Sequence, residues 1–159
     1  MQIADLLSPE GVVPALKLKD KNKAQLLKEL AERAAPLAKV PGKRILETLV
    51  ERERLGSTGV GQGIAVPHGR LGDIDKIVGV FARLETPVEY EAVDNQPVDL
   101  VFMLLAPEGA GADHLKALAR VSRLLRNQTA CEKLRNANTA EALYAILTEP
   151  PAGSSSVAA

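Results

Sequence analysis

The feature that most constrains the fold is a nearly unbroken apolar run in the second half of the chain. Residues 98–105 read Val-Asp-Leu-Val-Phe-Met-Leu-Leu, so a single polar residue interrupts the run. Strict alternation of apolar and polar residues would predict a strand with one face in water, whereas a continuous run is typical of a strand covered on both faces. The sequence therefore predicts a buried strand at this place, inside a sheet that has helices on either side.

The remaining elements are consistent with such a sheet. Further strands are predicted at residues 12–18, 77–81 and 88–90. Apolar residues recur at helical spacing in several segments, which predict helices at residues 22–37, 43–54, 113–126, 131–135 and 140–147, with a helical turn at 3–7. Strands interspersed with helices predict an α/β sandwich, in which helices flank both faces of a central mixed, mostly parallel sheet.

Local signals set the expected ends of these elements. Pro36 and the Pro41-Gly42 pair should end the first helix, and Gly56 should end the second. Asn138 and Glu141, three residues apart, form a capping pair that opens the last helix. Prolines, a glycine and serines at the C-terminus indicate a disordered tail. We expect one domain at residues 1–148 and a disordered tail at 149–159, a length that suits a single core.

Composition argues against several classes of function. Lys+Arg and Asp+Glu number 20 each, so the formal net charge is zero and no basic surface for nucleic acid is expected. Aromatic residues make up 3% of the chain, which leaves little to stack on bases. Cys131 is the only cysteine, and with two distant histidines it makes a poor metal-ligand set. We expect no metal and no other cofactor.

The chain also lacks the signals of export. Residues 1–5 have neither the basic region nor the long apolar region of a signal peptide. No apolar run approaches the ~20 residues that span a bilayer. We therefore expect a cytoplasmic protein without membrane insertion.

The main candidate for chemistry is His68, one of two histidines in the chain. Six of the twelve glycines lie around it in residues 56–72, and glycine lets other groups approach the backbone closely. Pro67 fixes φ directly before the imidazole, and Gly69 follows it. This setting predicts a titratable nucleophile on an ordered, uncluttered surface. The alternative is a solvated loop histidine.

Arg52 departs from the apolar pattern of its helix. It shares a helix face with Ile45 and Leu49 and lies at the helix end, directly before the glycine-rich segment. A guanidinium in that position needs an anionic partner to offset its desolvation, and its planar donor fork matches phosphate oxygens. The structural alternative is ion pairing with a carboxylate of Glu51, Glu53 or Asp5.

His114 is a second departure, because it shares a helix face with Leu118, Val121 and Leu125. It lies in the first helical turn, whose positive end favours an anion and disfavours an imidazolium. We expect a neutral His114 that can donate a hydrogen bond to an oxyanion. The alternative is that it only caps its helix.

The glycine-rich segment is not a nucleotide-binding motif. Residues 59–65 read Gly-Val-Gly-Gln-Gly-Ile-Ala, which matches neither G-x-G-x-x-G nor the P-loop, and they precede a strand-like run. ATP and NAD binding are therefore disfavoured. Arg54 and Arg70 are expected to be surface charges, and Ser57-Thr58 could either cap a turn or contact an anion.

Three segments carry a resemblance to a known family. They are residues 52–61, Arg-Glu-Arg-Leu-Gly-Ser-Thr-Gly-Val-Gly, residues 63–70, Gly-Ile-Ala-Val-Pro-His-Gly-Arg, and residues 114–118, His-Leu-Lys-Ala-Leu. The chain resembles the IIA components of the bacterial phosphoenolpyruvate-dependent phosphotransferase system, in the fructose/mannitol-type class that includes the nitrogen-regulatory IIA proteins. The order of elements agrees from about residue 3 to residue 147, so the resemblance covers nearly the whole chain.

The resemblance implies a role for each candidate residue. His68 would accept a phosphoryl group from the histidine of an HPr-like carrier or its nitrogen-branch equivalent, with Arg52 and His114 as active-site neighbours. The chemistry agrees with the residues, because a neutral imidazole is a good nucleophile. In-line phosphoryl transfer mainly needs positioning and charge stabilisation, and transfer between two histidines needs no metal.

The branch of the system is predicted from sequence similarity in the glycine-rich segment. Residues 56–65 are more similar to the nitrogen-regulatory proteins than to the sugar-specific ones, and no segment could be a IIB, IIC or HPr domain. We expect a regulatory phosphocarrier of the transferase class, whose phosphorylation controls binding to proteins such as potassium-transport regulators. The alternatives are a sugar-transport IIA that passes phosphate to a separate IIB, and a non-transferring adaptor that binds an anion or a protein through the same face.

Overall fold

The apolar run forms strand β6 (Val98–Pro107), the centre of the sheet, and every residue from 100 to 106 is fully buried. In the computed structural model, which describes residues 1–150, β6 pairs on one side with β5 (Val78–Val88). Two short strands in succession pair with its other side, β3 (Ile64–Ala65) and then β4 (His68–Leu71). Strand β1 (Val12–Leu16) lies beside β5, and β2 (Gly59–Gly61) lies beside β3.

The strands run in both directions. The pairs β1–β5, β3–β6 and β4–β6 are parallel, and the pairs β5–β6 and β2–β3 are antiparallel. The strand order is β1-β5-β6-β3-β2, with β4 on the later part of β6. The prediction of a mixed sheet is confirmed.

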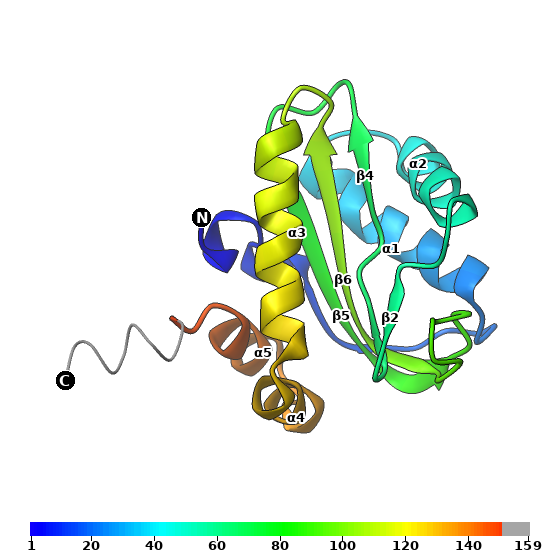
Figure 1. Cartoon of the computed structure of the whole chain (residues 1–159), viewed down its shortest axis with the longest axis vertical. Coiled ribbons are helices and arrows are strands. Elements are labelled where there is room, and N and C mark those ends of the chain that lie inside the picture. Colours follow the sequence, from blue (N-terminus) through cyan, green and yellow to red (C-terminus); the bar gives the residue numbers. More distant parts are fainter. Residues whose placement is uncertain (151–159) are drawn as a thin grey trace.

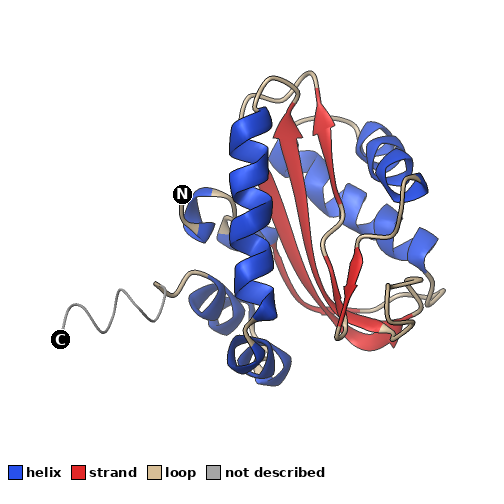
Figure 2. Cartoon of the chain, viewed as in Figure 1, coloured by secondary structure: helices blue, strands red, loops and turns tan. Residues whose placement is uncertain are grey.

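Helices cover both faces of this sheet (Figures 1 and 2). One face carries α1 (Lys23–Ala38) and α2 (Gly42–Arg54). The other carries α3 (Gly111–Arg126), α4 (Gln128–Asn136) and α5 (Ala140–Leu147), together with the short 3₁₀ helix η1 (Ile3–Asp5). A second 3₁₀ helix, η2 (Pro9–Gly11), leads into β1. The predicted α/β sandwich is confirmed, and no helix within residues 1–150 is long and apolar enough to cross a bilayer.

The two faces explain the composition of β6. Its odd-numbered apolar residues, such as Val101 and Met103, belong to the core beneath α1 and α2. Its even-numbered ones from Leu100 to Leu104 belong to the core beneath α3 to α5. Side chains alternate between the faces of a strand, so a strand with a core on each side must be apolar at both even- and odd-numbered positions.

Several predicted ends are wrong. Strand β5 is continuous, although two strands were expected, because its pairing with β6 shifts register between Arg83 and Val88 and so accommodates Pro87. Pro36 does not end α1, which continues to Ala38; near a helix end, proline removes a single backbone hydrogen bond.

Strand β1 ends at Leu16, not at residue 18 as predicted. Other differences concern helix starts. Thr139, not Asn138, caps α5, because its side chain accepts a hydrogen bond from the Ala142 N–H. Helices α3 and α4 begin earlier than predicted, and the Asn127 side chain caps α4 by accepting from the Ala130 N–H. Of the predicted tail, residues 151–159 lie outside the described part of the chain.

Candidate functional site

The glycine-rich segment folds into three short strands rather than a loop. Strands β2 and β3 form a hairpin whose turn has positive φ at Gly61, Gln62 and Gly63, a conformation that favours glycine, and glycine occupies two of the three positions. The chain then passes Pro67 and enters β4, in which His68 pairs with Leu104 of β6. His68 therefore has a fixed place at the start of a strand.

The His68 ring is held through one of its nitrogens. Nδ1 lies 2.8 Å from the Val66 carbonyl oxygen, an acceptor, so Nδ1 carries the proton. Nε2 consequently bears the lone pair, and it accepts a hydrogen bond from Arg52 Nε at 3.3 Å. Burial is the main cause that lowers the pKa of His68, and the Arg52 charge adds to it, while the Val66 hydrogen bond acts in the opposite direction. The half-buried imidazole is thus neutral near pH 7, with Nε2 as its nucleophilic atom.

Arg52 comes from the last turn of α2 and is half-buried. Its Nη1 donates to the Gly56 carbonyl at 2.9 Å, which orients the guanidinium beside His68. Three carboxylates were considered as its ion-pair partners, those of Glu51, Glu53 and Asp5. Each of them is bonded to another group. Within residues 1–150 no carboxylate pairs with Arg52, so its charge is available to an anion.

His114 lies in the first turn of α3, opposite His68. The two ring centroids are 5.5 Å apart with an interplanar angle of 68°. His114 Nδ1 accepts a hydrogen bond from Arg70 Nε at 3.2 Å, so Nε2 carries the proton. The imidazole is 4% exposed, and its buried Nε2 has no partner within the described residues. An unpartnered buried donor costs free energy, and it can be satisfied by an incoming oxyanion.

The predicted neutrality of His114 has a different main cause from the one expected. Burial lowers the pKa of His114 to about 4, and the charges of His68 and Arg70 add to the effect. The helix end was the expected cause. The alternative that His114 only caps its helix is wrong, because the imidazole bonds to Arg70 and no side chain caps α3.

Arg70 was predicted to be a surface charge only. Its side chain is exposed, but its Nε bonds to His114, and its charge also lowers the pKa of His68. Residues two apart on a strand share a face, so the location of Arg70 on the same face as His68 follows once residues 68–71 are recognised as a strand. Arg54, in contrast, is exposed and pairs with Glu51 at 2.6 Å, as expected of a surface charge.

The two hydroxyl residues of the segment do not bond to this histidine pair. Ser57 donates to the Tyr90 carbonyl at 3.3 Å and accepts from the Gly59 N–H at 3.1 Å. Thr58 is buried and bonds to Glu53 and to Tyr90. Neither Glu53 nor Tyr90 was predicted to belong to the site. Glu53 could have been noticed only as the neighbour of Arg52.

The arrangement suits a tetrahedral anion bound at His68 Nε2. A neutral lone pair faces the space beside Arg52, and His114 offers a free N–H from the other side. Two guanidinium groups, Arg52 and Arg70, flank the imidazole pair. Preorganised donors and cations of this kind stabilise charge that develops during transfer of a phosphoryl group.

Comparisons with known proteins agree on one family. The sequence model of the family described as "Phosphoenolpyruvate-dependent sugar phosphotransferase system, EIIA 2" matches residues 6–149. A nitrogen regulatory protein of Bradyrhizobium diazoefficiens is 55% identical over 152 residues, which cover 96% of this chain and 98% of the relative. The nitrogen regulatory protein of Escherichia coli K12 is 41% identical over 150 residues, covering 94% and 91% of the two chains.

A solved structure agrees as well. The crystal structure of the nitrogen regulatory protein IIA-Ntr from Neisseria meningitidis superposes with a TM-score of 0.85 at 34% identity. The superposition covers 92% of this chain and 99% of that one. The likeness therefore extends over the whole sandwich.

Proposed function

The chain belongs to the EIIA type 2 family of the phosphoenolpyruvate-dependent sugar phosphotransferase system, and on that premise we propose that it is a phosphohistidine carrier. His68 is the proposed acceptor. The observation that carries the proposal is the position of its Nε2 lone pair, which faces Arg52 while Nδ1 is held by the Val66 carbonyl.

The proposed step exchanges one phosphorus–nitrogen bond for another. His68 Nε2 attacks the phosphorus of a phosphohistidine on the donor protein, and a bond between Nε2 and phosphorus forms. The bond between phosphorus and the donor imidazole breaks, and the donor nitrogen takes the electron pair. The proton stays on His68 Nδ1, which donates it in a hydrogen bond to the Val66 carbonyl, so the step needs no net proton transfer.

Each neighbour has a proposed part in this step. Arg52, released from His68 Nε2, would bind the equatorial oxygens with its donor fork. His114 would donate its free Nε2–H to a phosphoryl oxygen, while Arg70 keeps the other nitrogen of that ring as an acceptor. We add Arg70 to the site residues because it selects the tautomer of His114 on which this donation depends.

The proposed partner is an HPr-like phosphocarrier of the nitrogen branch, and the proposed role is regulatory. The relatives named nitrogen regulatory proteins support this branch. Phosphorylation adds negative charge at His68, and we propose that this charge controls binding to target proteins such as potassium-transport regulators. The proposal includes a cytoplasmic location and one functional unit at residues 1–148.

The chemistry is tested by reconstituted labelling. The protein is incubated with phosphoenolpyruvate, enzyme I and an HPr-like carrier, and intact mass is measured before and after acid treatment. We expect an acid-labile gain of one phosphoryl group. The His68→Ala variant should gain none, whereas His114→Ala, which keeps the acceptor, should gain it more slowly. Equal labelling of His68→Ala and wild type would disprove the assignment.

The branch is tested by the choice of acceptor. The phosphorylated protein is mixed with a fructose- or mannitol-type IIB, and loss of phosphate from His68 is followed with time. Slow or absent transfer supports the regulatory role. Rapid transfer supports the sugar-transport alternative, and absence of any labelling in the first experiment supports the adaptor alternative.

A further inference from the structure

A buried polar cluster lies behind the proposed acceptor, and the phosphoryl chemistry described above does not use it. We call it the Glu53 network, and its members are Glu53, Lys23, Thr58 and Tyr90. The side chain of Glu53 is 6% exposed and that of Lys23 is 17% exposed, while Thr58 and Tyr90 are buried. Burial of a carboxylate and an ammonium is costly unless both are paired and hydrogen-bonded.

Both carboxylate oxygens of Glu53 are fully engaged. Oε1 accepts from Lys23 Nζ at 2.7 Å and from the Thr58 N–H at 3.1 Å. Oε2 accepts from the Thr58 hydroxyl and from the Tyr90 phenol at 3.2 Å. Burial and the Glu53 charge raise the pKa of Tyr90, so the phenol keeps the proton that it donates.

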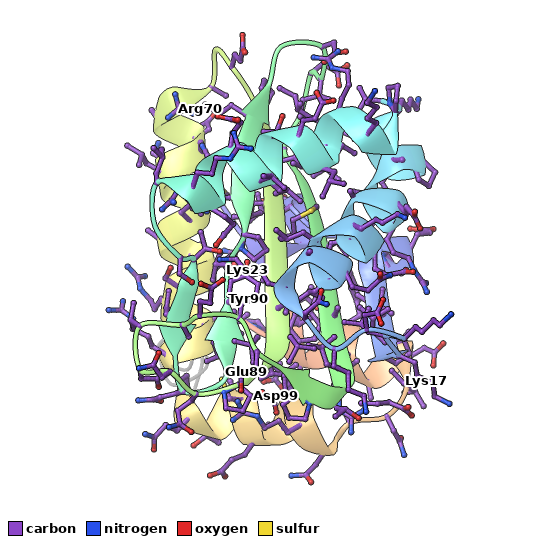
Figure 3. All side chains as sticks on the ribbon, turned by 90° about the vertical axis from the view of Figure 1, so that its right-hand side faces the viewer. Lys17, Lys23, Arg70, Glu89, Tyr90 and Asp99 are labelled. Carbon is purple, nitrogen blue, oxygen red and sulfur yellow. The ribbon has the colours of Figure 1, made fainter. Side chains whose placement is uncertain are left out.

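The network joins four separate parts of the fold. Lys23 opens α1, Glu53 lies in the last turn of α2, Thr58 directly precedes β2, and Tyr90 follows β5. Lys23 and Tyr90 lie next to each other in Figure 3, with Lys23 Nζ 4.7 Å from the centroid of the Tyr90 ring. A single carboxylate therefore holds the start of the glycine-rich segment against both helices of one layer.

A chain of hydrogen bonds leads from this carboxylate to the acceptor imidazole. Glu53 fixes Thr58, whose carbonyl accepts from the Val66 N–H at 3.0 Å. The Val66 carbonyl in turn accepts from His68 Nδ1 at 2.8 Å. Glu53 is also the neighbour of Arg52, so it anchors the same helical turn that carries the anion-binding guanidinium. The positions of both His68 and Arg52 thus depend on Glu53.

We infer that Glu53 is a positioning residue for phosphoryl transfer: through Thr58 and Val66 it keeps the proton on His68 Nδ1 and points Nε2 toward Arg52. The inference rests on the proposed function of His68. Glu53 itself touches neither the acceptor nitrogen nor the phosphoryl group. Its loss should therefore change the His68 tautomer and the transfer rate, without removing the acceptor.

The test compares two glutamate-to-glutamine substitutions in the same helix turn. Glu53→Gln keeps the side-chain shape but places an N–H donor where the carboxylate accepts from donors only. Glu51→Gln makes the same change of charge at an exposed position and is the control. Transfer from a phosphorylated HPr-like carrier, the ¹⁵N chemical shifts of the His68 ring and the thermal melting curve are measured for both variants.

We expect Glu53→Gln to slow transfer by about 10- to 100-fold, the size of effect that a small misplacement of reacting groups produces. The ring ¹⁵N shifts should show an increased share of the Nε2–H tautomer. Glu51→Gln should match wild type in rate and tautomer. A folded Glu53→Gln variant that transfers at the wild-type rate, or that slows without any tautomer shift, would overturn the inference.

A second variant covers the case in which Glu53→Gln does not fold. Tyr90→Phe removes only the phenol hydroxyl and leaves the ring against Lys23. It should slow transfer several-fold with a smaller tautomer shift, and wild-type behaviour would then overturn the inference. Failure of the proposed function itself is distinguishable, because in that case the wild-type protein gains no phosphoryl group at all.

Discussion

Replacement of His114 by glutamine removes the group that titrates but keeps an N–H donor. The effect of this replacement on stability can be worked out from the structure. The folded protein holds His114 with a pKa of about 4, whereas the unfolded chain has a histidine pKa near 6.5. The unfolded state therefore binds more protons between these values, and stability falls as the pH drops through 6.5 toward 4. With these two pKa values, His114 costs the folded state about 2 kcal/mol at pH 5 and almost nothing at pH 7.

The assay is urea denaturation of wild type and His114→Gln at pH 7, 6 and 5. Glutamine does not titrate, so between pH 7 and pH 5 the wild-type free energy of unfolding should fall by about 2 kcal/mol more than that of the variant. This difference corresponds to about 4–8 °C in melting temperature for a chain of this size. His68 is present in both proteins, so the comparison isolates the effect of replacing His114. Identical pH dependence in the two proteins would refute the claim that His114 is buried and neutral.

The transfer rates of His114→Gln and of a second variant, His114→Leu, test the hydrogen bond. Glutamine can present an N–H near the position of His114 Nε2, so His114→Gln should transfer phosphate within about fivefold of wild type. His114→Leu keeps the bulk but offers no donor, and it should be slower by about 100- to 1,000-fold, the range found when one preorganised donor is lost. Equal rates for the two variants would mean that the unpartnered N–H has no part in transfer.

Three further outcomes are expected. Arg52→Lys should slow transfer at least tenfold without lowering the melting temperature, because an ammonium lacks the bidentate fork; Arg54→Lys is the exposed control, and a similar loss there would contradict the assignment. The transfer rate should reach half of its plateau at a pH below 6.5, since burial lowers the pKa of His68 and protonation removes the Nε2 lone pair; a half-maximal rate above pH 6.5 in a pH series would be inconsistent with the site. Gly59→Ala should destabilise by about 1–3 kcal/mol in urea denaturation, because its Cβ would lie 2.8 Å from another side chain, whereas Gly109→Ala, with no atom within 4 Å, should be nearly neutral.

The layers of the fold could be predicted from the sequence because burial leaves a direct mark on composition. The run in β6 is apolar at both even- and odd-numbered positions from Leu100 to Leu105, since the two sets of side chains face different cores. Strand limits were harder to predict. Separate strands were predicted at residues 77–81 and 88–90, yet β5 continues between them through Pro87, because a shift of register removes the need for a regular ladder at that point. That compensation depends on the partner strand and is invisible in the local sequence.

The site could be predicted only in part, for a similar reason. His68, Arg52 and His114 stand out because a glycine-rich setting or an apolar pattern surrounds each of them. Arg70 and Glu53 do not stand out, since one is exposed and the other lies beside charged residues in a helix end. Their importance comes from contacts between distant segments, such as Arg70 with His114, that only the assembled sheet creates.

The reacting atoms would serve either branch of the phosphotransferase system, because the same imidazole and cations suit any phosphohistidine donor. Selection of partners must therefore lie in the surface around His68. Three large apolar side chains in the segments that carry the site are well exposed, namely Leu55 after α2, Val60 in β2 and Leu115 beside His114. Exposed apolar groups gain free energy only when a partner covers them, about 25 cal/mol per Å². Contact with such residues can favour one docking protein over another while leaving the chemistry unchanged, so carriers with identical histidine sites can serve different pathways.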